Sequence, residues 1–127
     1  MNEPKKYAIK VTAQGFYLPD QSDVENDQYV FGYSVHIENV GQTPAQLVSR
    51  HWLITDADNQ VQEVRGMGVV GEKPKLQPGQ SFIYTSLTEL GTDSGTMRGQ
   101  YHMLAEDGTR FEAIIPEFSL AMPQVFH

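Results

Sequence analysis

The chain has no cysteine, and this absence removes several kinds of chemistry. Without a thiol there is no disulfide framework, no cysteine nucleophile and no zinc site built on thiolates. No apolar run approaches the ~20 residues that a membrane-spanning helix needs. The first residues, MNEPKKYAIKVTA, lack the apolar segment of a secretory signal, so we expect a cytoplasmic protein.

Positive charge is also scarce. Nine Lys and Arg residues stand against 16 acidic residues, which gives a net charge of −7. Nucleic acids and anionic membranes are bound through basic surfaces, so we expect neither as a partner. The charge is uneven along the chain. Residues 20–27 carry four acids and no base, whereas Arg65, Lys73 and Lys75 lie close together and are offset only by Glu72.

No long window has helical periodicity, and alternation of apolar and polar residues dominates instead. The alternating segments are YAIKVTA, YVFGYSVHIEN, AQLVSRHWLIT, QSFIYTS, TMRGQYHMLA and TRFEAII. Turn residues separate them, and Asp107-Gly108 is a strong hairpin signal. About seven such strands predict an all-β fold, an antiparallel β-sandwich of immunoglobulin or fibronectin type III kind. We expect one domain over residues 1–127, with its core at about 7–122.

Two positions make the strand assignment specific. Alternation in AQLVSRHWLIT places Val48 on one face with Trp52 and Ile54, and Leu47 on the other face. Trp52 is expected to be buried on a central strand. Pro116 has no N–H to donate, so it is predicted at a strand end, a bulge or an edge.

A Gly-x-Gly-x-x-Gly spacing occurs at Gly66, Gly68 and Gly71. A dinucleotide fingerprint needs a helix after the glycines, and Pro74 and Pro78 exclude one here. Two interpretations are left: the glycines serve backbone turns, or their amide groups form an anion-binding nest. The candidate anion-binding residues are Arg65, Gly66, Gly68, Gly71, Lys73 and Lys75.

No pattern predicts a metal site, a cofactor or catalytic residues. The four histidines, His36, His51, His102 and His127, are not spaced for shared ligation. DADNQV opens like a calcium loop, but Val61 stands at the glycine position and Met67 at the final glutamate position. Ser49 and His51 lack an oriented third partner. We therefore expect no enzyme activity.

Most of the chain, from Tyr7 to Met122, resembles the ApaG domain family. The matching motifs are Arg50-His51-Trp52, Val64-Arg65-Gly66, Gly68-Val69-Val70-Gly71, Pro78-Gly79 and Ile115-Pro116. The resemblance implies a fibronectin type III-like sandwich and a one-domain bacterial protein in the cytoplasm. It also implies a binding module, because eukaryotic F-box proteins and a polymerase-interacting protein carry similar domains. Bacterial members are linked to cobalt resistance and magnesium efflux.

Together these features predict a non-catalytic module that binds a protein partner through loops and an open sheet face. One alternative is a binder of pyrophosphate or a nucleotide through the glycine-rich loop, residues 65–75. Another, less favoured, is a protein that binds divalent metal directly. Unpaired edge strands would also allow a homodimer.

Overall fold

The computed structural model describes residues 5–124. Within this range the regular elements are β-strands, apart from two short 3₁₀ turns, η1 (Pro19–Gln21) and η2 (Val24–Asn26). The strands are β1 (Ile9–Tyr17), β2 (Tyr29–Asn39), β3 (Ala45–Asp56), β4 (Val61–Met67), β5 (Lys75–Leu76), β6 (Ser81–Leu90), β7 (Ser94–Ala105) and β8 (Arg110–Ala121). No helix in this part of the chain could cross a membrane.

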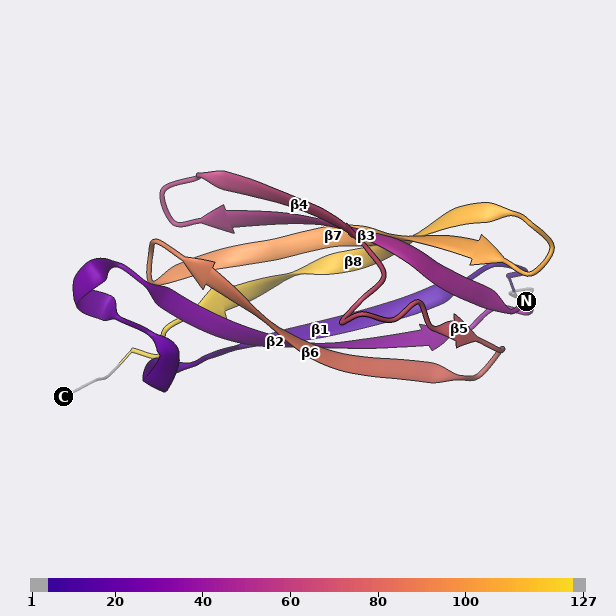
Figure 1. The fold of residues 1–127 in the computed structure, drawn as a ribbon, viewed down its shortest axis with the longest axis horizontal. Helices are drawn as coiled ribbons and strands as arrows, with labels where there is room; N and C mark the ends of the chain where they lie inside the picture. Colours follow the sequence, from indigo (N-terminus) through magenta and orange to yellow (C-terminus); the bar gives the residue numbers. More distant parts are fainter. Residues whose placement is uncertain (1–4, 125–127) are drawn as a thin grey trace.

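The strands form two antiparallel sheets, which confirms the predicted sandwich. One sheet has the order β1-β2-β6 and the other β4-β3-β7-β8, with β5 pairing to one end of β3. Seven long strands and the two-residue β5 agree with the expected number. Figure 1 shows the strands running along the long axis of the molecule and the two sheets lying one above the other, with the β4–β5 connection crossing from one sheet toward the other.

The two lateral sides of the sandwich differ. On one side the edge strands β1 and β8 lie against each other, so that side is closed. On the other side the edge strands are β4 and β6, and neither pairs with a further strand in residues 5–124. We call this second side the open side. The loop that follows β4 closes only one end of it.

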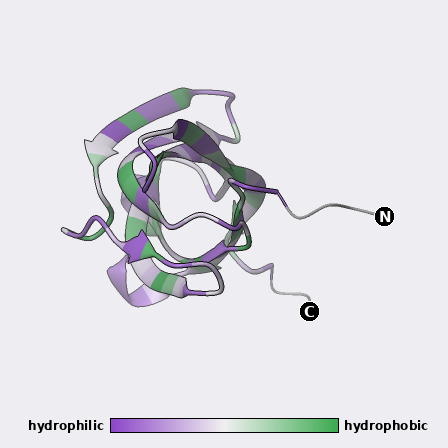
Figure 2. Ribbon diagram, turned by 90° about the vertical axis from the view of Figure 1, so that its right-hand side faces the viewer, coloured by the Kyte–Doolittle hydropathy of each residue, from purple (hydrophilic) through white to green (hydrophobic). Residues whose placement is uncertain are grey.

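The core lies between the sheets and is centred on Trp52. Its side chain is 2% exposed, as predicted. It meets the rings of Tyr33, Tyr101 and Phe118 edge-on, with ring centroids 5.4, 6.3 and 6.0 Å away. Edge-to-face contacts of this kind add to the free energy gained by burial. In the end-on view of Figure 2, hydrophobic and hydrophilic residues alternate along several strands.

A buried asparagine ties the end of β2 to the segment after the glycine-rich loop. Asn39 is 1% exposed and its side-chain groups are satisfied. Its Nδ2 donates to the carbonyls of Thr43 and Leu76, at 3.0 and 2.9 Å, and its Oδ1 accepts from the amide of Gly41. Asn39 therefore holds β5 at the end of the open side that the loop after β4 closes.

Pro116 lies where its missing N–H does no harm. It belongs to β8, which is an edge strand of its hydrogen-bonded sheet. The β7–β8 register shifts here, so that Pro116 and Glu117 together oppose Arg98. This bulge at an edge confirms the prediction made for Pro116.

We expect Trp52→Ala to lower the free energy of unfolding by about 3–5 kcal/mol, through lost burial and the cavity left behind. Denaturant unfolding measures this loss. Val61→Ala is the control, because Val61 is 61% exposed on β4 and should change stability by no more than about 0.5 kcal/mol. A loss below about 1 kcal/mol for Trp52→Ala would contradict its central place in the core.

Candidate functional site

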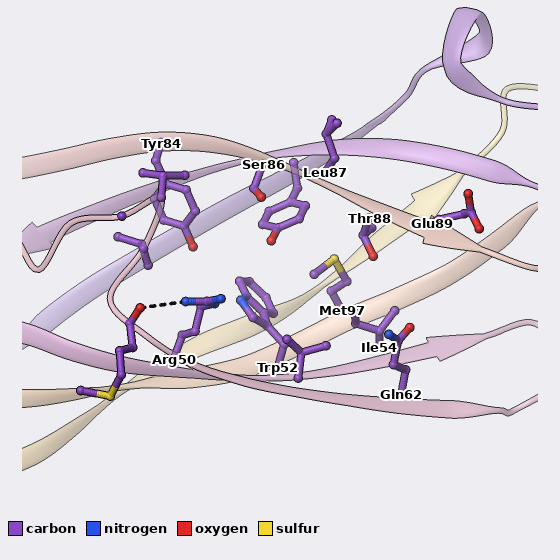
Figure 3. A pocket seen from close by; sticks show the side chains of 16 residues that line it. Arg50, Trp52, Ile54, Gln62, Tyr84, Ser86, Leu87, Thr88, Glu89 and Met97 are labelled. Carbon is purple, nitrogen blue, oxygen red and sulfur yellow. Dashed lines mark hydrogen bonds between the residues drawn. The ribbon is translucent and has the colours of Figure 1, made fainter.

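A cleft of about 690 Å³ occupies the open side of the sandwich. In Figure 3, side chains from β3 and from β6 point toward one another across it. The labelled β3 residues are Arg50, Trp52 and Ile54, and the inward-facing β6 residues are Tyr84, Ser86 and Thr88. This volume is within the range of ordinary ligand and peptide sites.

The wall of the cleft on β6 has an inverted pattern. The inner face of a closed sandwich is apolar, but Ser86 and Thr88 face inward and are half-buried. The residue between them, Leu87, is 53% exposed. Gln62 adds a further polar side chain from β4. The interior of the open side is therefore suited to polar contacts rather than to tight apolar packing.

The floor of the cleft carries a hydrogen-bond donor without an acceptor. The Nε1 atom of Trp52 is the one buried side-chain nitrogen or oxygen in residues 5–124 that has no hydrogen-bond partner. An unsatisfied buried donor costs about 1–3 kcal/mol, and buried indole N–H groups usually find a partner. Figure 3 shows the nitrogen side of the indole facing the Arg50 guanidinium. The donor is therefore unsatisfied, and an acceptor can reach this buried nitrogen only when the side chains over it move aside.

A bulge in β3 changes which of the residues before Arg50 face the core. The β3–β7 register shifts between Leu47 and Ser49, so the alternation is interrupted there. Leu47 consequently lies in the core with Trp52, and Val48 does not. The expected facing of Leu47 and Val48 was wrong, because simple alternation does not anticipate an inserted residue. Beyond the bulge, Arg50 shares the inner face with Trp52.

Arg50 also fixes the glycine-rich loop. Its Nη1 donates to the carbonyls of Met67 and Gly68, at 3.0 and 2.9 Å. A Cβ atom at Gly66 would lie 2.6 Å from Nη2 of Arg50, so a side chain there would displace the guanidinium. None of the ion pairs found in residues 5–124 involves Arg50. Its charge is therefore not balanced by a carboxylate.

The other two glycines of the motif serve the backbone. Gly68 and Gly71 have φ of 63° and 80°, in the left-handed region that favours glycine. Val69 and Glu72 exchange two backbone hydrogen bonds of 2.8 Å, which close a tight turn, and the Gly68 amide donates to Val48. Three amides of the loop are thus already engaged within the protein.

The bases expected around an anion lie apart from the cleft. Arg65 is on the outer face of its sheet, with Nη2 2.6 Å from Oε1 of Glu63. Hydrogen bonds from Arg65 and His51 lower the pKa of Glu63. Lys75 lies 3.9 Å from Glu106. Of the six candidate anion-binding residues, Gly71 lines the cleft and the other five do not.

Gly66 lies under Arg50, and the Lys73 side chain passes beside Gly68. Arg50 itself was not among the candidates. Its spacing of two residues from Trp52 on one strand was the signal that could have identified it.

The histidines among residues 5–124, His36, His51 and His102, do not line the cleft. His51 and His102 each face one carboxylate, Glu63 at 2.9 Å and Glu112 at 3.8 Å. Residues 5–124 contain no group of three or more His, Asp or Glu residues placed to hold a metal ion. His127 lies outside the described residues.

We expect wild type and Arg65→Ala to show the same weak response to pyrophosphate in calorimetry, because the Arg65 guanidinium is already hydrogen-bonded to Glu63. Gly68→Ala should lower stability, since alanine is strained at its positive φ. Thermal unfolding measures that loss. A tenfold weaker pyrophosphate affinity in Arg65→Ala would contradict this account and support the anion-binding loop.

Comparison with known proteins gives consistent matches. The family model described as the ApaG domain matches residues 19–105. Proteins named ApaG from Dechloromonas aromatica and Thiobacillus denitrificans are 59% and 58% identical over 127 residues, covering all of both chains. A crystal structure of a Bordetella pertussis protein assigned as ApaA is 53% identical and covers 97% of this chain and 100% of its own, with a TM-score of 0.93.

Proposed function

This chain belongs to the ApaG domain family, and from that premise we propose that it is a non-catalytic binding module which receives a segment of a partner protein in the cleft on its open side. One observation carries the proposal. A polar-walled cleft of about 690 Å³ between two unpaired edge strands contains a buried donor, Trp52 Nε1, with no acceptor among the described residues.

The rim of the cleft supports a macromolecular partner. Met67, Val70 and Leu87 line it and are 61%, 55% and 53% exposed. Exposed apolar side chains grouped around a polar depression are typical of interaction sites. The edges of β4 and β6 also have backbone groups free to pair with an added strand. Both features favour an extended protein segment over a small molecule alone.

The titratable groups of the cleft favour binding over catalysis. Burial raises the pKa of Tyr84, and the Tyr84 hydroxyl is hydrogen-bonded to that of Tyr101. A general base works best with a pKa near the operating pH, so Tyr84 stays protonated and acts as a donor or a neutral acceptor. Glu89 lies at the far end of β6 from Tyr84, on an exposed stretch of strand. We assign these groups to holding a ligand.

We place the family's link to cobalt resistance and magnesium efflux with the partner rather than with an ion held by this chain. His51 and His102 each face a single carboxylate, and a single His–carboxylate pair is fewer ligands than a specific transition-metal site uses. Binding of pyrophosphate or a nucleotide by the glycine-rich loop is the second candidate. It has less support, because Arg65 and Lys75 already lie beside carboxylates.

A photo-cross-linking amino acid placed at Leu87 tests the proposal in bacteria that lack their own copy of the protein. We expect a discrete adduct of higher mass from Leu87, on the rim of the cleft, because the partner segment would lie against it. Ile114 is the matched control, since it is 62% exposed but lies on β8, away from the cleft.

Mass spectrometry of the adduct identifies the partner, and an adduct of twice the chain mass identifies a second copy. Equal cross-linking from Leu87 and Ile114, or none from Leu87, would contradict a partner site on the open side.

A further inference from the structure

We propose that the cleft recognises one carboxylate carried by an extended segment of the partner, and that Arg50 and the indole N–H of Trp52 hold it. This inference rests on the proposed function and names the chemistry that the site selects. It concerns the side-chain group that enters the cleft, whereas the proposed function concerns only the place of binding.

The charge of Arg50 is not balanced by a carboxylate among the described residues. The protein has a net charge of −7, yet none of the ion pairs found in residues 5–124 includes this arginine. Arg50 is half-buried, so its charge is only partly solvated. Its Nη1 donates hydrogen bonds to two neutral carbonyls, those of Met67 and Gly68. Its remaining N–H donors fit the paired oxygens of a carboxylate or a phosphate group.

The Arg50 guanidinium and the Trp52 indole lie on the same side of β3. Arg50 and Trp52 are two residues apart on one strand, so their side chains share the inner face. Both line the same cleft, and the indole nitrogen faces the guanidinium. Trp52 Nε1 has no acceptor of its own. One carboxylate between them would satisfy the indole donor with one oxygen and balance the arginine with the other.

The charge of the surroundings selects a monoanion. A phosphate group at pH 7 carries about 1.5–2 negative charges, and the cleft supplies one cation. Of the three bases of the glycine-rich loop, Arg65 and Lys75 lie beside Glu63 and Glu106, and Lys73 does not line the cleft. Glu89 also lines the cleft. A second negative charge would therefore have no cation of the cleft lining to pair with and would share the cleft with Glu89.

The shape of the cleft selects an extended segment. Its lining follows β6 from Tyr84 to Glu89, which is about 17 Å at about 3.4 Å per residue of strand. A segment of about five residues can add to the free edge of β6, with alternate side chains turned inward. The carboxylate then enters at Arg50, and apolar neighbours meet Met67 and Leu87 at the rim.

The test follows the indole N–H signal of Trp52 in ¹H–¹⁵N spectra, which is unique because the chain has one tryptophan. The probes are two blocked pentapeptides, Val-Thr-Glu-Thr-Val and Val-Thr-Gln-Thr-Val, which differ only in the central charge. We expect the glutamate peptide to bind at least about tenfold more tightly than the glutamine peptide, and the difference to shrink in high salt.

Variants locate the effect. Arg50→Gln should reduce the affinity for the glutamate peptide to that for the glutamine peptide. Arg65→Gln is the matched control and should change the affinity for neither peptide, because Arg65 lies on the outer face of its sheet. Arg50 also holds the glycine-rich loop, so the comparison of the two peptides on wild type decides the matter without any variant.

Three results would overturn the inference, and they are distinguishable. Equal affinity for both peptides would remove the carboxylate and leave the binding module intact. Acetate shifting the indole signal at the same concentration as the glutamate peptide would show a site for small anions instead of a segment. No shift at Trp52 or along β6 with either peptide would overturn this inference, and together with no cross-link from Leu87 it would overturn the proposed function as well.

Discussion

The open side of this sandwich depends on the two hydrogen bonds that Arg50 donates to the carbonyls of Met67 and Gly68. They hold the loop after β4 against the inner face of β3, and Gly66 is the residue that lets the guanidinium lie there. With the loop fixed, Val69 is buried in the core and one end of the cleft is closed. The same side chain therefore shapes the cleft and supplies its charge.

Unequal closure of the two sides gives the fold its binding surface. Where β1 meets β8 the core is sealed, and Leu120 is 1% exposed. Between β4 and β6 the inner face instead contains Ser86, Thr88 and an indole donor without an acceptor. Natural proteins depart from efficient packing mainly at functional sites. A partner that restores the missing hydrogen bond would recover part of the stability lost there.

Alternation predicted the sandwich and the burial of Trp52, because side chains on a strand repeat with a period of two. The edge position of Pro116 followed from its missing N–H. Alternation failed at Leu47 and Val48, where the bulge in β3 changes the facing. The glycine spacing was visible, but its cause was not, since Gly66 is required by an arginine 16 positions away in sequence. Arg65, Lys73 and Lys75 were close in sequence, yet Arg65 pairs with Glu63 on the same strand and Lys75 lies beside the distant Glu106. The cleft itself depends on which edges stay unpaired, and local patterns do not contain that information.

Hydrogen exchange of the Trp52 indole proton under native conditions tests most directly whether the open side is an accessible site with a free donor. The nitrogen is buried, but no group among the described residues accepts its proton, so its exchange needs only a local opening of the cleft. We therefore expect it to exchange faster than the backbone amides of Ile54 and Tyr101, which lie in paired strands. Those amides exchange through larger openings of the sheet. Exchange of the indole proton at the same slow rate as these amides would contradict the account, because it would mean that the cleft is closed to solvent.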